Sequence, residues 1–150
     1  MFAQQQLAGP QYAHPGQKSC CHSKIRGINI NFPDVFPVNS VKAMRGCLFA
    51  NKEDKLVEFA SNVFQSYWGD GIDISKDDLL LDIAKNSNLN IKEFKEFISS
   101  QEARDLLMEN TEDLVKRGGF GSPTFFYNEH MFFGNDRLHL LEAVLEKNLI

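Results

Sequence analysis

Apolar residues recur at steps of three and four through the middle of this chain of 150 residues. This spacing places them on one face of a helix and predicts a largely helical centre. The clearest case has six apolar positions on a single face: Leu56, Phe59, Ala60, Val63, Phe64 and Tyr67. We expect this helix to begin at Glu53 or Asp54 and to end near Trp68, before two glycines.

Polar residues suited to helix starts divide the rest of the centre. The side chains of Ser40, Ser75 and Asn90 can accept hydrogen bonds from the free N–H groups of a first turn. Asp78 stands near a predicted helix start, where the helix dipole favours an acid. With Gly118-Gly119 as a stop, helices are predicted over residues 40–51, 53–68, 76–86, 91–99 and 101–117.

The pattern changes near the C-terminus. Short apolar and aromatic runs over residues 124–127 and 130–133 predict two strands. Asn128-Glu129 gives them a two-residue hairpin connection. A last helix is predicted over residues 136–147.

Composition and charge narrow the class of protein. Hydrophobic residues are 43% and charged residues 24%, which is ordinary for a globular domain, and no apolar run is long enough for a transmembrane helix. The net charge is −4, and from residue 34 onward 13 basic and 20 acidic residues give −7. Nucleic-acid binding needs clustered Lys and Arg, so this balance argues against it. We expect a cytoplasmic protein, or a mitochondrial one, because the acid-free start shares a feature of transit peptides.

Two segments near the C-terminus carry the candidate chemistry. Proline at Ser122-Pro123 can hold a cis peptide bond at the mouth of the first strand. There the backbone of Ser122 is expected to pair with a peptide ligand as a strand would. Asn135 and Asp136 open the last helix, where N–H groups and the helix dipole favour an anion. The alternatives are a structural proline in a turn and simple helix capping.

The cysteines and histidines point to no reaction. Cys20-Cys21-His22 lacks the ligand number and spacing of a zinc site, so no metal is expected. The chain has no Cys-x-x-Cys, and Cys47 lies in a helical pattern that predicts a buried, inert thiol. His130 and His139 have no serine and acid in a supporting order, and we expect packing or surface roles for both.

The C-terminal motif resembles the 2-hydroxychromene-2-carboxylate isomerases and the kappa-class glutathione transferases, within the DsbA-like thioredoxin superfamily. The matching residues are Gly121-Ser122-Pro123-Thr124-Phe125, then Phe133-Gly134-Asn135-Asp136-Arg137-Leu138. Two earlier segments agree in order: Phe36-Pro37-Val38-Asn39-Ser40 with Ala43-Met44-Arg45, and the stretch from Val63 to Ile72 with its Trp68-Gly69-Asp70-Gly71. The similarity covers roughly residues 24–146.

The resemblance implies a fold. Family members begin with an apolar strand that ends in Ser-Pro-Tyr or Ser-Pro-Phe, and residues 1–23 contain no such run. We therefore expect an α/β, thioredoxin-like (DsbA-like) fold with an all-helical insert and without its N-terminal βαβ part. The expected order is an irregular leader over 1–23 and a family domain over 24–150, with the insert over about 40–117 and strand, strand and helix over 118–150.

The resemblance also implies a function. Glutathione would lie along Ser122-Pro123 with its γ-glutamyl end at Asn135-Asp136, and its thiolate would attack a small aromatic electrophile in a pocket walled by Trp68. The catalytic residue is unknown, because the serine that activates the sulfur belongs to the segment not found here. The alternatives are a truncated, non-catalytic binding protein and, more weakly, a DsbA-like thiol-disulfide oxidoreductase. The apolar edge of the 124–127 strand would need a homodimer partner or an N-terminal segment.

Overall fold

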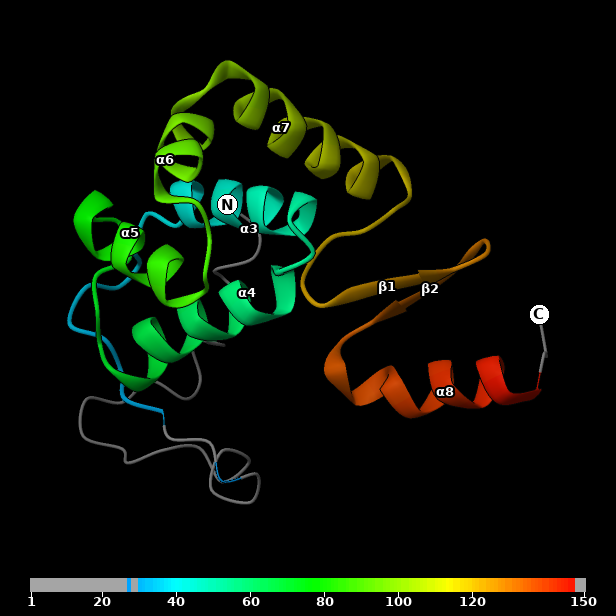
Figure 1. Ribbon diagram of the computed structural model, residues 1–150. Coiled ribbons are helices and arrows are strands. Elements are labelled where there is room, and N and C mark those ends of the chain that lie inside the picture. The colour runs from blue at the N-terminus through cyan, green and yellow to red at the C-terminus, as the bar shows by residue number, and fades with distance from the viewer. Residues whose placement is uncertain (1–26, 28–29, 148–150) are drawn as a thin grey trace. The chain divides into compact units, whose positions relative to one another are not determined.

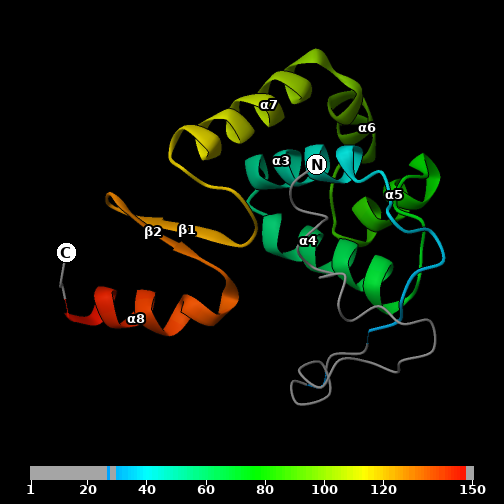
Figure 2. The same cartoon turned by 180° about the vertical axis from the view of Figure 1, so that it is seen from behind.

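The computed structural model describes residue 27 and residues 30–147. These residues fall into two compact units, one ending at Asn110 and the other beginning at Thr111. Figures 1 and 2 show the first as a group of helices and the second as a hairpin beside a helix. The elements are α3 (Val41–Lys52), α4 (Leu56–Phe64), the π-helix η1 (Gln65–Gly69), α5 (Asp77–Asn86), α6 (Ile91–Ser99), α7 (Gln101–Lys116), β1 (Thr124–Tyr127), β2 (His130–Phe133), the 3-10 helix η2 (Asn135–Arg137) and α8 (Leu138–Lys147).

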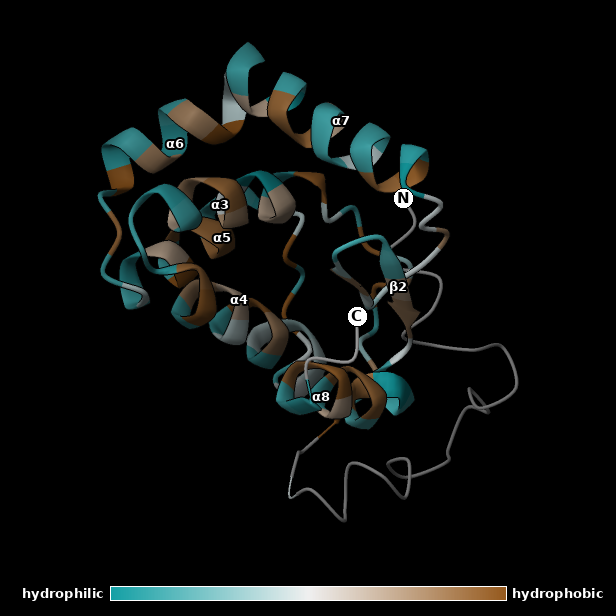
Figure 3. Ribbon diagram, turned by 90° about the vertical axis from the view of Figure 1, so that its right-hand side faces the viewer, coloured by the Kyte–Doolittle hydropathy of each residue, from teal (hydrophilic) through white to brown (hydrophobic). Residues whose placement is uncertain are grey.

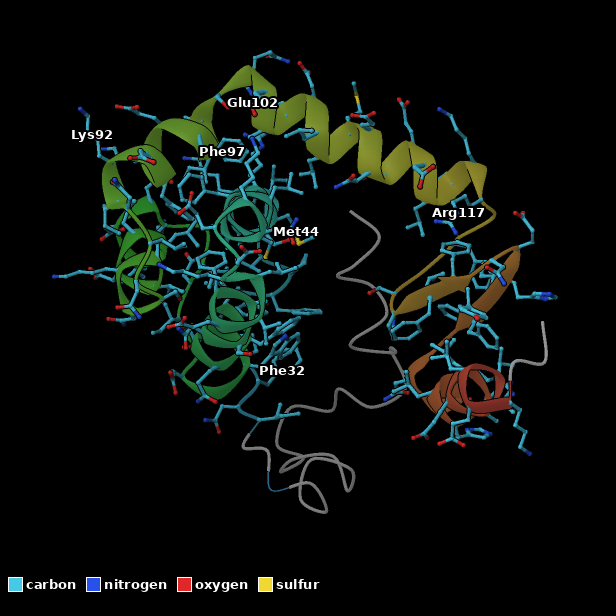
Figure 4. The ribbon with its side chains drawn as sticks, turned by 45° about the vertical axis from the view of Figure 1, so that its right-hand side comes forward. Phe32, Met44, Lys92, Phe97, Glu102 and Arg117 are labelled. Carbon is cyan, nitrogen blue, oxygen red and sulfur yellow. The ribbon has the colours of Figure 1, made fainter. Side chains whose placement is uncertain are left out.

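Phenylalanine rings form the centre of the helical unit. Phe59 of α4 and Phe94 of α6 are fully buried, with ring centroids 5.4 Å apart. Figure 4 shows Phe97 of α6 reaching toward α3, where its ring lies 5.6 Å from that of Phe49. A Cβ at Gly46 would come within 2.8 Å of the Phe59 ring, so glycine allows α3 to approach these rings closely. The inward faces of these helices are correspondingly apolar in Figure 3.

The helix starts confirm one predicted cap and correct two. Asn90 caps α6, accepting hydrogen bonds from the N–H groups of Lys92 (3.1 Å) and Glu93 (3.3 Å). The side chain of Ser40 makes no capping hydrogen bond at α3. Asn39 accepts instead from the Val41 N–H.

Ser75 also fails as a predicted cap. Its hydroxyl donates to Asp73 Oδ1 at 2.6 Å, and Lys76 occupies the cap position of α5 without a side-chain bond. This hydrogen bond and the one from the Ser75 N–H hold the pKa of Asp73 below its ordinary value. At both serines a neighbouring Asn or Asp makes the local side-chain hydrogen bond in place of the predicted cap.

The predicted helix over 53–68 differs at both ends. It begins at Leu56, because Asp54 takes a positive φ of 56° and closes the turn after α3. After Phe64 the backbone widens into the π-helix η1, which ends at Gly69. The predicted apolar face is confirmed in part: Phe59 and Tyr67 are buried, whereas Leu56 and Phe64 are exposed.

The C-terminal unit confirms the predicted hairpin. β1 and β2 pair antiparallel, from Thr124 opposite Phe133 to Tyr127 opposite His130, and Asn128 in the turn has a φ of 50°. The last helix is reached through η2, so α8 begins at Leu138 rather than at the predicted Asp136. α8 lies along the hairpin in Figures 1 and 2.

Some sequence predictions concern residues outside the described part of the chain, and others remain untested. The leader over 1–23, with Cys20, Cys21 and His22, lies outside the described residues. The division of the family domain near residue 117 stays a prediction, as the compact units separate within α7. No helix among residues 30–147 is long and apolar enough to cross a membrane.

Candidate functional site

The hairpin brings the two predicted binding segments together. Thr124 and Phe133 face each other at the end of the sheet away from the Asn128-Glu129 turn. One residue beyond each, the Gly134 N–H donates to the Pro123 carbonyl oxygen at 2.9 Å. Ser122-Pro123 and Asn135-Asp136 therefore flank one end of the hairpin, although they are more than ten residues apart in sequence.

The segment before β1 is held by local contacts. The Ser122-Pro123 peptide bond is cis, as the sequence predicted. Thr124 Oγ1 donates to the Gly121 carbonyl oxygen at 2.5 Å, which closes a short turn around Ser122 and Pro123. Ser122 itself is exposed and Pro123 is half-buried. The turn thus places Ser122 at the surface of the C-terminal unit.

Two residues of the loop after α7 pack against the hairpin, one on each strand. The Phe120 ring packs on the Phe133 ring with centroids 4.5 Å apart. The guanidinium of Arg117 lies 3.8 Å from the centroid of the Phe126 ring. A cation over an aromatic face is attracted by the ring quadrupole. Sequence analysis missed Arg117, since only the fold brings its side chain to β1.

The carboxylate of Asp136 is exposed beside Gly134. Its Oδ2 lies 3.6 Å from Nε of the neighbouring Arg137, and the two side chains are 72% and 56% exposed. Arg137 and Asp136 therefore form a surface ion pair. At such exposure the pair is weak, so the carboxylate remains able to exchange one cation for another.

The DSBA-like thioredoxin domain family matches residues 20–146, which is most of the chain. The chain belongs to this family. A solved structure titled as selenomethionine 2-hydroxychromene-2-carboxylate isomerase aligns with a TM-score of 0.74 at 29% identity, over 83% of this chain and 61% of that one. The DsbA-like thioredoxin fold with a helical insert is thereby confirmed.

Curated members of the family carry two names. The 2-hydroxychromene-2-carboxylate isomerase of Pseudomonas putida is 31% identical over 82% of this chain and 60% of its own length. The human glutathione S-transferase kappa 1 is 29% identical over 79% of this chain and 58% of its own. The predicted resemblance to both groups is confirmed. The chain spans about 60% of the length of the curated isomerase from Pseudomonas putida.

Trp68 belongs to the helical unit and has aromatic neighbours there. It lies in η1, and its ring centroid is 4.8 Å from that of Tyr67, 6.4 Å from that of Phe32 and 6.3 Å from that of Phe36. Phe32 and Phe36 are 56% and 41% exposed, so this cluster offers open aromatic surface. Whether Trp68 walls a substrate pocket stays a prediction.

The sequence predicts no reaction for Cys47, His130 and His139. Burial raises the pKa of the Cys47 thiol to about 11, which agrees with the predicted inert cysteine. His130 and His139 are both exposed. Within the part of the chain that the structure describes, no three His, Cys, Asp or Glu side chains gather as metal ligands would.

Proposed function

We propose that this chain binds glutathione at the open end of its hairpin and serves a glutathione-dependent isomerase or transferase reaction on an aromatic electrophile. The observation that carries the proposal is the meeting of Ser122-Pro123 with Asn135-Asp136 through the Gly134–Pro123 hydrogen bond. The family names support it, since one relative is called a glutathione transferase and others are called isomerases. Bound glutathione would supply a thiol as the nucleophile.

Asp136 suits the γ-glutamyl end of the tripeptide. Its exposed carboxylate can accept hydrogen bonds from the ligand ammonium, a charge-assisted interaction. Asn135, also exposed, would add an amide beside it. The ammonium would take the place that the Arg137 guanidinium holds in the ion pair.

The Ser122-Pro123 segment suits the cysteinyl part. An extended peptide ligand can form backbone hydrogen bonds with Ser122. Such bonds use only main-chain atoms of the ligand, so they do not depend on its side chain. The thiol would then stand close to the start of β1. The neighbouring Phe120 and Phe133 rings would limit the space beside it.

Trp68 suits the aromatic substrate. Its cluster with Phe32 and Phe36 exposes aromatic surface, on which a planar electrophile can stack. Trp68 is the chain's single tryptophan, so its fluorescence would report such stacking directly. We assign this residue to substrate contact and not to the chemical step.

Calorimetry with glutathione tests the proposal on the purified full chain. We expect the wild type to bind, and Asp136→Ala to weaken binding by about 10- to 100-fold, as one charge-assisted hydrogen bond contributes roughly 1.5–3 kcal/mol. Glu129→Ala is the matched control, because Glu129 is also an exposed acid of the hairpin but lies in its far turn. Its affinity should equal that of the wild type.

A modified ligand tests whether Asp136 recognises the ammonium group of glutathione or affects binding in another way. Glutaryl-cysteinyl-glycine lacks the amino group of glutathione, so it should bind the wild type more weakly and should lose little further affinity in Asp136→Ala. The proposal would be refuted if a folded wild type did not bind glutathione at 10 mM. A dissociation constant of that size corresponds to a binding free energy of about −2.7 kcal/mol. Binding without turnover of aromatic electrophiles would favour the non-catalytic alternative.

A further inference from the structure

We propose that Gly134 positions the Asp136 carboxylate, because its missing Cβ leaves the space that Asp136 Oδ1 occupies. This inference rests on the proposed function for its ligand, but its geometry can be tested without one. Gly134 has three roles at the open end of the hairpin. Its N–H donates to the Pro123 carbonyl oxygen, its backbone turns the chain into η2, and its lack of a Cβ leaves space for the Asp136 carboxylate. No side chain at position 134 could fill all three.

The contact with Asp136 is specific. A Cβ built on Gly134 would lie 2.5 Å from Asp136 Oδ1 and 3.7 Å from its Cγ. Carbon and oxygen atoms do not approach so closely without a bond, so an alanine would force the carboxylate away. Asp136 Oδ2, on the other side, faces the Arg137 guanidinium. The carboxylate therefore lies between the Gly134 backbone and the Arg137 side chain.

The backbone adds a second requirement. Gly134 has φ 97° and ψ 151°, a region open almost only to glycine. In this conformation its N–H reaches the Pro123 carbonyl oxygen while the chain turns into η2. The same glycine thus fixes the distance between the Ser122-Pro123 segment and the Asp136 carboxylate.

A second glycine provides a matched control for backbone strain. Gly118, in the loop after α7, also has a positive φ, of 86°, but a Cβ there would meet nothing within 4 Å. Both Gly134→Ala and Gly118→Ala should lower the melting temperature. Only Gly134→Ala should move the Asp136 carboxylate.

The first measurement uses NMR without any ligand. In the wild type, the three-bond couplings of the Asp136 Cα–Cβ bond should report one rotamer, with nuclear Overhauser contacts between the Asp136 β-protons and the Gly134 α-protons. Gly134→Ala should change these couplings, and Gly118→Ala should not. Averaged couplings in the wild type, or an unchanged rotamer in a folded Gly134→Ala, would overturn the inference even if glutathione binds.

The second measurement is a double-mutant cycle in glutathione affinity. Gly134→Ala should weaken binding about tenfold or more in the wild type and clearly less in the Asp136→Ala background, because coupled residues do not add. Equal losses in both backgrounds would show that Gly134 acts independently of Asp136 and would refute the inference. A wild type that binds no glutathione would refute the proposed function, and the NMR measurement would still decide the role of Gly134.

Discussion

The side chain of Cys47 shows how burial alters the chemistry of a single residue. Its thiol lies in α3, packed against the core of the helical unit. Removal from water disfavours the thiolate and raises the pKa from its ordinary value of 9.0 to about 11. Because the thiolate is the reactive form, this cysteine is poorly suited to nucleophilic or redox chemistry at neutral pH.

This shift predicts a pH dependence of stability. Between pH 9 and pH 11 the unfolded chain loses a thiol proton that the folded chain retains, so the free energy of unfolding falls as pH rises. The loss from Cys47 should be about 1 kcal/mol between pH 8 and pH 10. Urea unfolding at these two pH values, for the wild type and Cys47→Ala, measures it.

The comparison needs a variant because Tyr67 contributes in the same direction. Burial also raises the pKa of the Tyr67 hydroxyl, and this effect is present in both proteins. The difference between the two pH slopes therefore isolates Cys47. Equal slopes would show that the thiol is more accessible to water than the fold implies.

At the scale of elements, the helix starts depend on which polar side chain reaches the free N–H groups. Asn90 begins α6 with two such hydrogen bonds and a further contact from its amide to Glu93. Ser40 stands at the equivalent position of α3 and makes none. Both residues are favoured caps by type, so sequence could not separate them.

The two positions give a matched pair of substitutions. Asn90→Ala should lower the free energy of unfolding by about 1 kcal/mol, because two N–H groups lose their acceptor. Ser40→Ala should change it by less than about 0.5 kcal/mol. Chemical denaturation monitored by circular dichroism measures both. A larger loss at Ser40 than at Asn90 would contradict this assignment of the caps.

At the scale of the whole molecule, the edge of β1 away from β2 has no strand partner among the described residues. Within the described residues, β1 pairs only with β2, and its four side chains are half-buried and uncharged. A strand edge without charge or proline invites another strand. The helix α8 also exposes apolar side chains, including Leu138, Leu140 and Leu145. We propose that these surfaces associate with a further strand, which a second copy of the chain can supply.

We expect this association to depend on β1. Tyr127→Lys places a charge on the strand and should shift the protein toward monomer, as edge lysines do in natural sheets. Size-exclusion chromatography with light scattering, over a range of concentrations, measures the shift. Glu129→Lys, in the turn, adds positive charge outside the strand and should leave the distribution unchanged. A wild type that stays monomeric at all concentrations would contradict the prediction.

The sequence by itself determined the elements and the family. Helical periodicity located α4, the Asn128-Glu129 turn located the hairpin, and the C-terminal motif identified the relatives, because these signals are local and each is written in a short segment.

Only the tertiary structure decided how separate segments act together. The aromatic neighbours Phe32 and Phe36 of Trp68 come from more than 30 residues away, and the hairpin brings the Phe126 ring to Arg117. The candidate site likewise depends on strand register, which brings Gly134 to Pro123. Register and packing are set by the sum of many contacts across the fold, and no short segment of the sequence contains that sum.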